Sequence, residues 1–142
     1  MNEHDKNFQT VFHIIKYCEK IKNTAETFQH SKINFKDKYN YVSRDACAFY
    51  ILQIGELTTN LTEEFKSKHD EIPWKAIKAM RNVVAHKYGQ INIDTTWETI
   101  TNDIPNLNKL CKKILRENHI DFEQSLKKEL KNEIGYNNGI ER

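Results

Sequence analysis

Apolar residues recur every three or four positions along most of this chain, which is the period of an α-helix with one buried face. The pattern predicts helices over residues 5–30, 38–67, 73–88 and 94–115, and a narrower apolar stripe predicts a last one over 122–134. No stretch alternates with the two-residue period of a half-buried strand. We therefore expect an all-α fold, a four- to five-helix antiparallel bundle.

Local signals mark several of these helix ends. Pro73 suits the first turn of a helix, where its missing N–H is not needed, and Gly89 suits the left-handed residue after a helix end. Asp94 is the predicted N-cap of the fourth helix. Pro105 lies inside that helix and is expected to kink it or split it in two. Gly55, inside the second helix, is compatible with a close contact to another helix.

Length and composition set further bounds. The chain has 142 residues, the size of one domain with its own core. Residues 1–118 are expected to form the helical bundle domain, followed by a polar C-terminal helix and tail over 119–142. The formal net charge of +2 does not by itself indicate polyanion binding, so any nucleic-acid site must be local. Cys18, Cys47 and Cys111 are odd in number and lie mostly in apolar helical pattern, which favours reduced core thiols.

Hydropathy gives no sign of a membrane protein. No apolar run reaches the roughly 18 residues of a membrane span, and the charged first residues do not resemble a signal peptide. We expect a cytoplasmic protein without membrane contact.

The helix predicted over residues 73–88 has two different faces. At about 100° per residue, its apolar face holds Ile77, Met80, Val84 and Tyr88. On the other side Arg81 and His86 lie about 140° apart. The arc between them is cationic and contains Lys75, Lys78 and Asn82. Lys75, Lys78 and the neighbouring Lys87 are the candidate RNA-binding residues.

The chemistry of this arc follows from its side chains. Histidine takes or gives a proton near neutral pH, and arginine has a planar charged fork that matches phosphate oxygens. His86 as a base beside Arg81 as a phosphate clamp therefore suggests phosphodiester cleavage. No histidine or carboxylate elsewhere stands at metal-ligand spacing, so neither a metal nor another cofactor is expected. The metal-independent route is attack by a ribose 2′-hydroxyl, which requires RNA because DNA lacks that group.

The geometry of one helix does not complete such a site. Side chains this far apart, with a rise of roughly 7.5 Å between them, converge poorly on a single phosphate. Two central helices meeting across a two-fold axis would bring Arg81 and His86 of each copy into one shared cleft. The pattern therefore suggests a homodimer with the site at its interface.

Each candidate also has a purely structural interpretation. Arg81 would then pair with a carboxylate on a neighbouring helix, and His86 would be a cation favoured by the helix dipole. Tyr88 would pack on the apolar side, and the lysines would be solvated. Asn82 would only orient the imidazole of His86.

Five segments, taken in order, carry a resemblance to a known family. They are Arg44-Asp45-Ala46, Ile54-Gly55-Glu56, Glu71-Ile72-Pro73-Trp74, Met80-Arg81-Asn82-Val83-Val84-Ala85-His86-Lys87-Tyr88, and Trp97-Glu98 with Asp103-Ile104-Pro105-Asn106-Leu107. Between about residue 8 and residue 115 the chain resembles the HEPN superfamily, and within it the HepT-like toxins of prokaryotic toxin–antitoxin pairs. The most specific part is the order arginine, four residues, histidine, one residue, tyrosine.

The resemblance implies an all-α bundle that dimerises and forms a metal-independent endoribonuclease site from two copies of the motif. On this basis Arg81 and His86 are the catalytic pair, and Asn82 is the polar residue beside them. The family's usual partner is a minimal nucleotidyltransferase antitoxin, which transfers AMP from ATP to the motif tyrosine, here Tyr88. A nucleotide at that position adds phosphate charge and bulk near the proposed base and would block the cleft.

Two functions remain open. The first is an RNA-cleaving toxin of a type VII-like toxin–antitoxin system, which acts on tRNA or mRNA and is silenced by AMPylation of Tyr88. The second is a non-catalytic helical module that binds a nucleotide or serves as an adaptor for a nucleotidyltransferase. The substitution His86→Ala separates them, because only the first predicts an RNA cleavage that it would abolish.

Overall fold

The structure is a computed structural model that describes the backbone of residues 3–84 and 91–141 and the side chains of residues 5–82 and 91–132. Within these residues every regular element is a helix, so the predicted all-α fold is confirmed. In chain order the elements are α1 (Glu3–Glu26), α2 (Lys32–Lys36), η1 (Lys38–Asn40), α3 (Tyr41–Thr58), α4 (Glu63–Lys68), α5 (Trp74–Val84), α6 (Ile93–Glu98), the π-helical turn η3 (Thr99–Asp103), α7 (Ile104–Glu117) and α8 (Glu123–Glu141).

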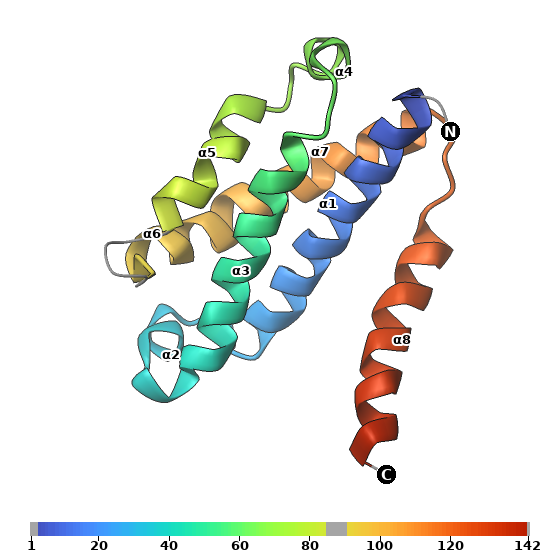
Figure 1. Ribbon diagram of the computed structural model, residues 1–142. Helices are drawn as coiled ribbons and strands as arrows, with labels where there is room; N and C mark the ends of the chain where they lie inside the picture. The colour runs from blue at the N-terminus through green and yellow to red at the C-terminus, as the bar shows by residue number, and fades with distance from the viewer. Residues whose placement is uncertain (1–2, 85–90, 142) are drawn as a thin grey trace.

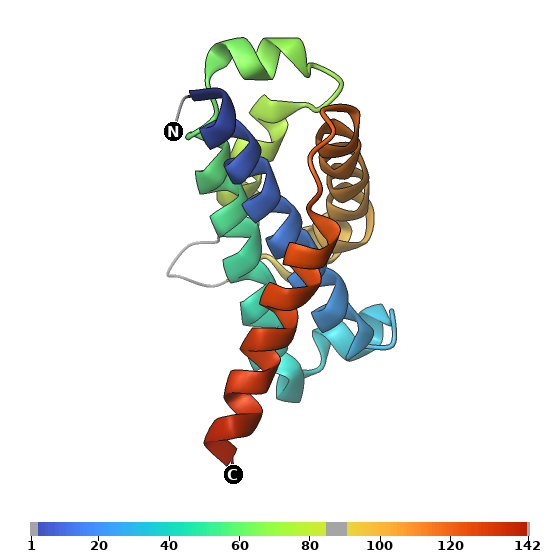
Figure 2. The ribbon, with the colours of Figure 1, turned by 90° about the vertical axis from the view of Figure 1, so that its right-hand side faces the viewer.

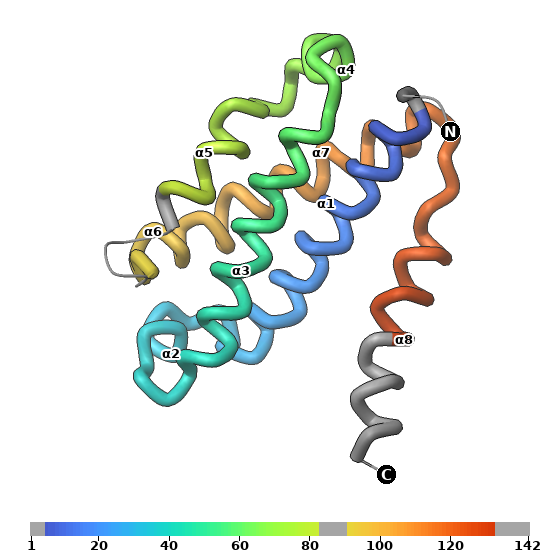
Figure 3. Tube along the Cα trace, viewed as in Figure 1, coloured from blue at the N-terminus to red at the C-terminus, as the bar shows by residue number. Residues whose placement is uncertain are grey.

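The long helices run in alternating directions and form an antiparallel bundle (Figure 1). Helix α1 packs between α3 and α7, while α5 packs on α3 and α6. Helix α8 lies against α1 on the side away from α3 (Figure 2). The trace in Figure 3 shows that α6, η3 and α7 follow one another without a loop. None of the helices in the described ranges has the length and apolar composition needed to cross a membrane.

Apolar side chains from α1, α3, α5, α7 and α8 meet in one core. Its centre is made mainly of isoleucines with no exposed surface, among them Ile14 and Ile21 of α1, Ile51 and Ile54 of α3, and Ile114 of α7. Each long helix therefore buries one apolar face, as its periodicity predicts, and burial of these faces is the main force that holds the bundle together.

The single helix predicted over residues 38–67 is wrong, because the chain turns between Thr59 and Thr62 and separates α3 from α4. Thr62 caps α4, and its hydroxyl accepts the backbone N–H of Phe65 at 3.1 Å. Asn7 of α1 holds this turn from outside. Its Nδ2 donates to Thr62 Oγ1 and its Oδ1 accepts the N–H of Thr62, both at 3.1 Å. Asn7, which lies 55 residues before Thr62, thus helps to fix the break between α3 and α4. The apolar pattern of the segment gives no sign of this partner.

The first helix ends at Glu26, earlier than the predicted end near residue 30. Gln29 and His30 have φ angles of 52° and 54°, the left-handed conformation in which helices often terminate. Neither of these two residues is a glycine, so the usual sequence signal for the end of a helix is missing.

The predicted N-cap at Asp94 is also wrong, because Asn92 caps α6 and accepts the N–H of Thr95 at 3.1 Å. Asp94 lies in the first turn of α6 and pairs with Lys32 and Lys36 of α2 at 3.3 and 3.5 Å. The hydrogen bond from Lys32 and the charge of Lys36 lower the pKa of Asp94. The carboxylate therefore links α2 to α6 instead of capping a helix.

A π-helical turn interrupts the regular α-helix beside Pro105, the residue at which a kink or a split is predicted. Pro105 lies in the first turn of α7, directly after the π-helical turn η3. Because proline has no backbone N–H, it cannot complete the regular α-helical ladder, and a π-helical turn is one way in which a helix absorbs the break.

All three cysteines are free and buried, which confirms the prediction of core thiols. Burial raises the pKa of each thiol, to about 12 for Cys47. Because the thiolate is the reactive form, we expect no fast-reacting thiol when the native protein is mixed with Ellman's reagent near neutral pH. All three thiols should react after unfolding in guanidinium chloride. A native thiol that reacts as fast as free cysteine would contradict this account of the core.

Candidate functional site

Helix α5 turns an apolar face to the bundle and a polar face outward. Trp74, Ile77 and Met80 are buried, with at most 7% of each residue exposed. The exposed side chains of the helix include Lys75, Lys78 and Asn82. The two faces predicted for the central helix are therefore present in its described part.

Helices α3 and α5 come into very close contact at Gly55. A Cβ atom placed on Gly55 would lie 3.2 Å from Arg81 Cβ and 3.3 Å from the carbonyl oxygen of Lys78. Both separations are shorter than ordinary contacts, so a side chain here would push α5 away. The close helix contact considered for Gly55 is confirmed, and it fixes where Arg81 stands relative to α3.

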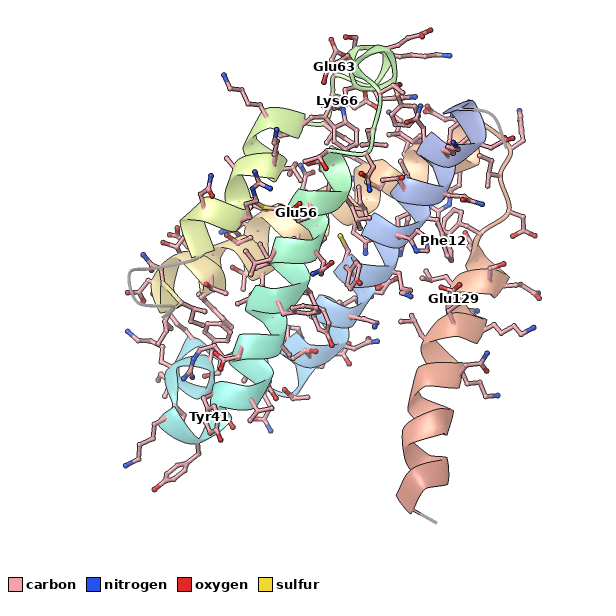
Figure 4. The ribbon with its side chains drawn as sticks, viewed as in Figure 1. Phe12, Tyr41, Glu56, Glu63, Lys66 and Glu129 are labelled. Atoms are coloured by element: carbon pink, nitrogen blue, oxygen red, sulfur yellow. The ribbon has the colours of Figure 1, made fainter. Side chains whose placement is uncertain are left out.

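Arg81 is paired with the residue that follows this glycine. Its Nη1 donates to Oε1 of Glu56, which Figure 4 shows on α3 beside α5. The side chain of Arg81 is 33% exposed and that of Glu56 is 58% exposed. A pair so open to water contributes less than about 1 kcal/mol to folding.

The pair bears on both interpretations of Arg81. A carboxylate partner on a neighbouring helix is what the structural interpretation predicts, and Glu56 is that partner. The guanidinium nevertheless has five N–H donors in a fixed fork, and the bond to Glu56 uses one of them. Arg81 is thus oriented by Glu56 and still has surface and donors for a phosphate.

The structure places part of the predicted site. The candidates that lie on the described part of α5 are Lys75, Lys78, Arg81 and Asn82. Three further candidates, His86, Lys87 and Tyr88, lie outside the described residues, as does the predicted helix end at Gly89. Among the described side chains, no group of three or more histidines, cysteines, aspartates or glutamates is placed to hold a metal ion.

Glu56 is the partner of Arg81 that the sequence argument did not identify. It lies 25 residues before Arg81 on a different helix, so the angles around α5 do not reveal it. The available signal was its place in Ile54-Gly55-Glu56, one of the segments that carry the family resemblance.

Two exposed apolar side chains of α3 lie on the same face of the helix as Glu56. Val42 and Phe49 of α3 are 65% and 52% exposed. Val42, Phe49 and Glu56 follow at seven-residue steps, so successive members differ by only about 20° around the helix. Tyr41, 56% exposed, lies at the far end of the same helix (Figure 4). We call the face formed by Val42, Phe49 and Glu56 the α3 stripe; it combines two exposed apolar side chains with one carboxylate.

The fold and the site together define a helical bundle that presents an oriented arginine at a helix crossing. The family model described as "Ribonuclease HepT-like" matches residues 14–114 of the chain. This chain belongs to the HepT-like ribonuclease family. The match includes all of α3 and α5 and ends within α7, and α8 lies beyond it.

Curated relatives carry names of the same kind. "Putative RNase TTE0752" of Caldanaerobacter subterraneus subsp. tengcongensis is 45% identical over 64 residues, which are 45% of this chain and 57% of that protein. "Probable ribonuclease HepT" of Thermococcus cleftensis is 39% identical over 54 residues, 38% of this chain and 49% of that protein. "Putative RNase MJ1216" of Methanocaldococcus jannaschii is 23% identical over 120 residues, 82% of this chain and 93% of that protein. The chain spans about half the length of the first two of these relatives. No solved structure matches the chain.

Proposed function

We propose that this chain is a metal-independent endoribonuclease with Arg81 and His86 as its catalytic pair. The observation that carries the proposal is the half-buried Arg81 guanidinium, which Glu56 orients at a surface crossing of α3 and α5 inside the family match. Asn82 follows Arg81 on the same helix and serves as the polar residue of the site. Three lysines, Lys75, Lys78 and Lys87, contact the RNA backbone through their charge.

The proposed reaction is an intramolecular phosphoryl transfer within the RNA. His86 takes the proton of a ribose 2′-hydroxyl, whose oxygen forms a bond to the adjacent phosphorus. The bond from phosphorus to the 5′-oxygen of the next nucleotide breaks, and that oxygen takes up a proton. Arg81 stabilises the negative charge that develops on the phosphate. The products are a 2′,3′-cyclic phosphate and a 5′-hydroxyl.

We further propose that the active form is a homodimer that packs through the α3 stripe. Because Glu56 is the last member of the stripe and holds Arg81, a second copy on this face would lie beside Arg81. A two-fold axis would then bring both copies of the motif to one cleft. This arrangement removes the geometric difficulty of placing Arg81 and His86 of one chain on a single phosphate.

The substitution Phe49→Asp is expected to weaken the dimer at least tenfold, because it puts a charge in the middle of the α3 stripe. Sedimentation equilibrium measures the change. Ile33→Asp is the matched control, since Ile33 is 83% exposed but lies on α2, off the stripe. Equal dissociation in both variants, or a stable Phe49→Asp dimer, would contradict the assignment of this face.

The same proposal extends to regulation. The chain is the toxin of a type VII-like toxin–antitoxin system and acts in the cytoplasm on tRNA or mRNA. A minimal nucleotidyltransferase silences it by AMPylation of Tyr88, because the added phosphate repels the RNA backbone near the base. Residues 1–118 form the catalytic domain, and residues 119–142 are an appended helix and tail.

Total cellular RNA tests the function. Protein with unmodified Tyr88 is incubated with the RNA beside the His86→Ala variant and beside protein AMPylated on Tyr88. We expect cleavage by the unmodified protein alone. Intact RNA in all three reactions, with the protein folded and free of AMP in the first, would contradict the proposal and favour the adaptor function.

A further inference from the structure

A groove with a volume of about 580 Å³ lies between α1 and α8 and is also lined by the turn that joins α7 to α8. Figure 4 shows Phe12 of α1 and Glu129 of α8 on its two sides. The apolar residues that form its floor are Phe8, Phe12, Leu115, Ile120 and Phe122. Phe12 and Ile120 are only partly buried, so the floor keeps apolar surface that a partner can cover.

The groove lies outside the part of the chain that the family model matches. That match covers residues 14–114, and every described lining residue lies before or after it. Four of these residues come from the first half of α1, and six come from the end of α7, the turn and α8. Helix α8 lies on the side of α1 away from α3 (Figure 2), so a second copy packed on the α3 stripe leaves the groove open. The groove is therefore separate from the proposed ribonuclease site and does not depend on it.

The rim of the groove is acidic. Asp5, Asp121 and Glu129 line it from α1, the turn and α8 respectively, and none of its described lining residues is basic. Lys16 pairs with Glu129 at 3.7 Å from outside the lining. Asp121 has no ion-pair partner among the described residues, so its charge is available to a ligand. The carboxylates Asp121 and Glu129 against one lysine already leave net negative charge beside the apolar floor, which favours a partner with positive charge.

We propose that this groove docks a basic amphipathic helix of a partner protein. Large apolar side chains on one face of that helix lie on the floor at Phe12 and Ile120, and its lysines or arginines lie at Asp121 and Glu129. A helix suits the groove better than an extended strand. The described walls are helices and a turn, and they offer no sheet edge to which a strand could add.

Fluorescence anisotropy with synthetic peptides tests the chemistry of the partner. The probe is a fluorescein-labelled helical peptide of four turns, about 14 residues, with leucines on one face and arginines on the other. One control peptide has glutamates in place of the arginines, and a second has the same composition with the leucines spread around the helix. We expect the probe to bind at least tenfold more tightly than either control, because each control keeps only one of the two kinds of contact.

Substitutions on the surface of the groove test its location. Ser125→Arg puts a cation into the groove, and Asp121→Lys reverses a rim charge; both residues are exposed, so the fold should be kept. Each should weaken binding of the basic probe at least tenfold. Gln124→Arg is the matched control, since Gln124 is exposed on α8 and does not line the groove, and its affinity should change less than twofold. Arg81→Ala should bind the probe like the wild type, which separates this groove from the ribonuclease site.

Three results would overturn the proposal. The first is that the folded wild type binds none of the peptides, or all three alike. The second is that Gln124→Arg loses as much affinity as the two groove variants. The third is that Ser125→Arg dissociates a wild-type oligomer in sedimentation equilibrium while no peptide binds, because the occupant would then be a second copy of this chain.

Discussion

The substitution Arg81→Ala is expected to lower the rate of RNA cleavage by about 10²–10³-fold, because it removes the donor that stabilises charge on the phosphate. Stability should change by less than about 1 kcal/mol, since the pair with Glu56 is open to water. The cleavage rate of Arg81→Lys should lie between the rates of the wild type and of Arg81→Ala, because lysine keeps the charge but not the planar fork. Initial rates on a defined RNA and urea unfolding measure both quantities. The exposed Lys113 of α7 offers a control, and Lys113→Ala should cleave within about twofold of the wild type.

A substitution of Glu56 tests the role of Arg81 in a second way. We infer that it positions Arg81, so Glu56→Gln should lower kcat by about tenfold and leave KM nearly unchanged. In an Arg81→Ala background the same substitution should have no further effect, because there is no guanidinium left to position. If the two residues form only a structural pair, both substitutions would shift unfolding slightly and leave cleavage unchanged. That result would contradict a catalytic role for Arg81.

The second large effect is expected at Gly55. Gly55→Leu should destabilise the fold by about 1–3 kcal/mol, because its Cβ alone would lie 3.2 Å from Arg81 Cβ. Cleavage by the folded fraction should fall at least tenfold, since displacement of α5 separates Arg81 from Glu56.

Urea unfolding and cleavage rates, corrected for the folded fraction, measure this result. Lys113→Leu is the control, because Lys113 is exposed on α7, on neither of the two helices that meet at Gly55. Wild-type stability together with wild-type cleavage in Gly55→Leu would show that the close contact at Gly55 does not position the site.

The sequence predicts the helices well because each has a long, regular apolar face. The predicted helix ends are wrong where an end depends on a residue far away in the chain or where two neighbouring residues could both cap the helix. The turn before α4 needs Asn7 of α1 to bind Thr62, and no property of the segment from Thr59 to Thr62 points to Asn7. The start of α6 was misplaced because Asn92 and Asp94 are both good caps, and only the structure shows that Lys32 and Lys36 engage Asp94.

The candidate site divides in the same way. Helical angles alone place Lys75, Lys78 and Asn82 on the outer face of α5, as the structure has them. The partner of Arg81 could not be found by that route, because it depends on how α3 crosses α5. The two helices come this close because glycine has no side chain at position 55. In the sequence alone, Gly55 is a glycine inside a helix and does not show which helix it contacts.

The central claim is that the RNA's own 2′-hydroxyl is the nucleophile, and a single 2′-deoxy substitution tests it most directly. A defined RNA is cleaved in EDTA by the unmodified protein, beside the same RNA with deoxyribose at the cleaved nucleotide. The account predicts a 2′,3′-cyclic phosphate and a 5′-hydroxyl from the first RNA and no cleavage at that position in the second. Cleavage at the deoxy position, or loss of all cleavage in EDTA, would contradict it.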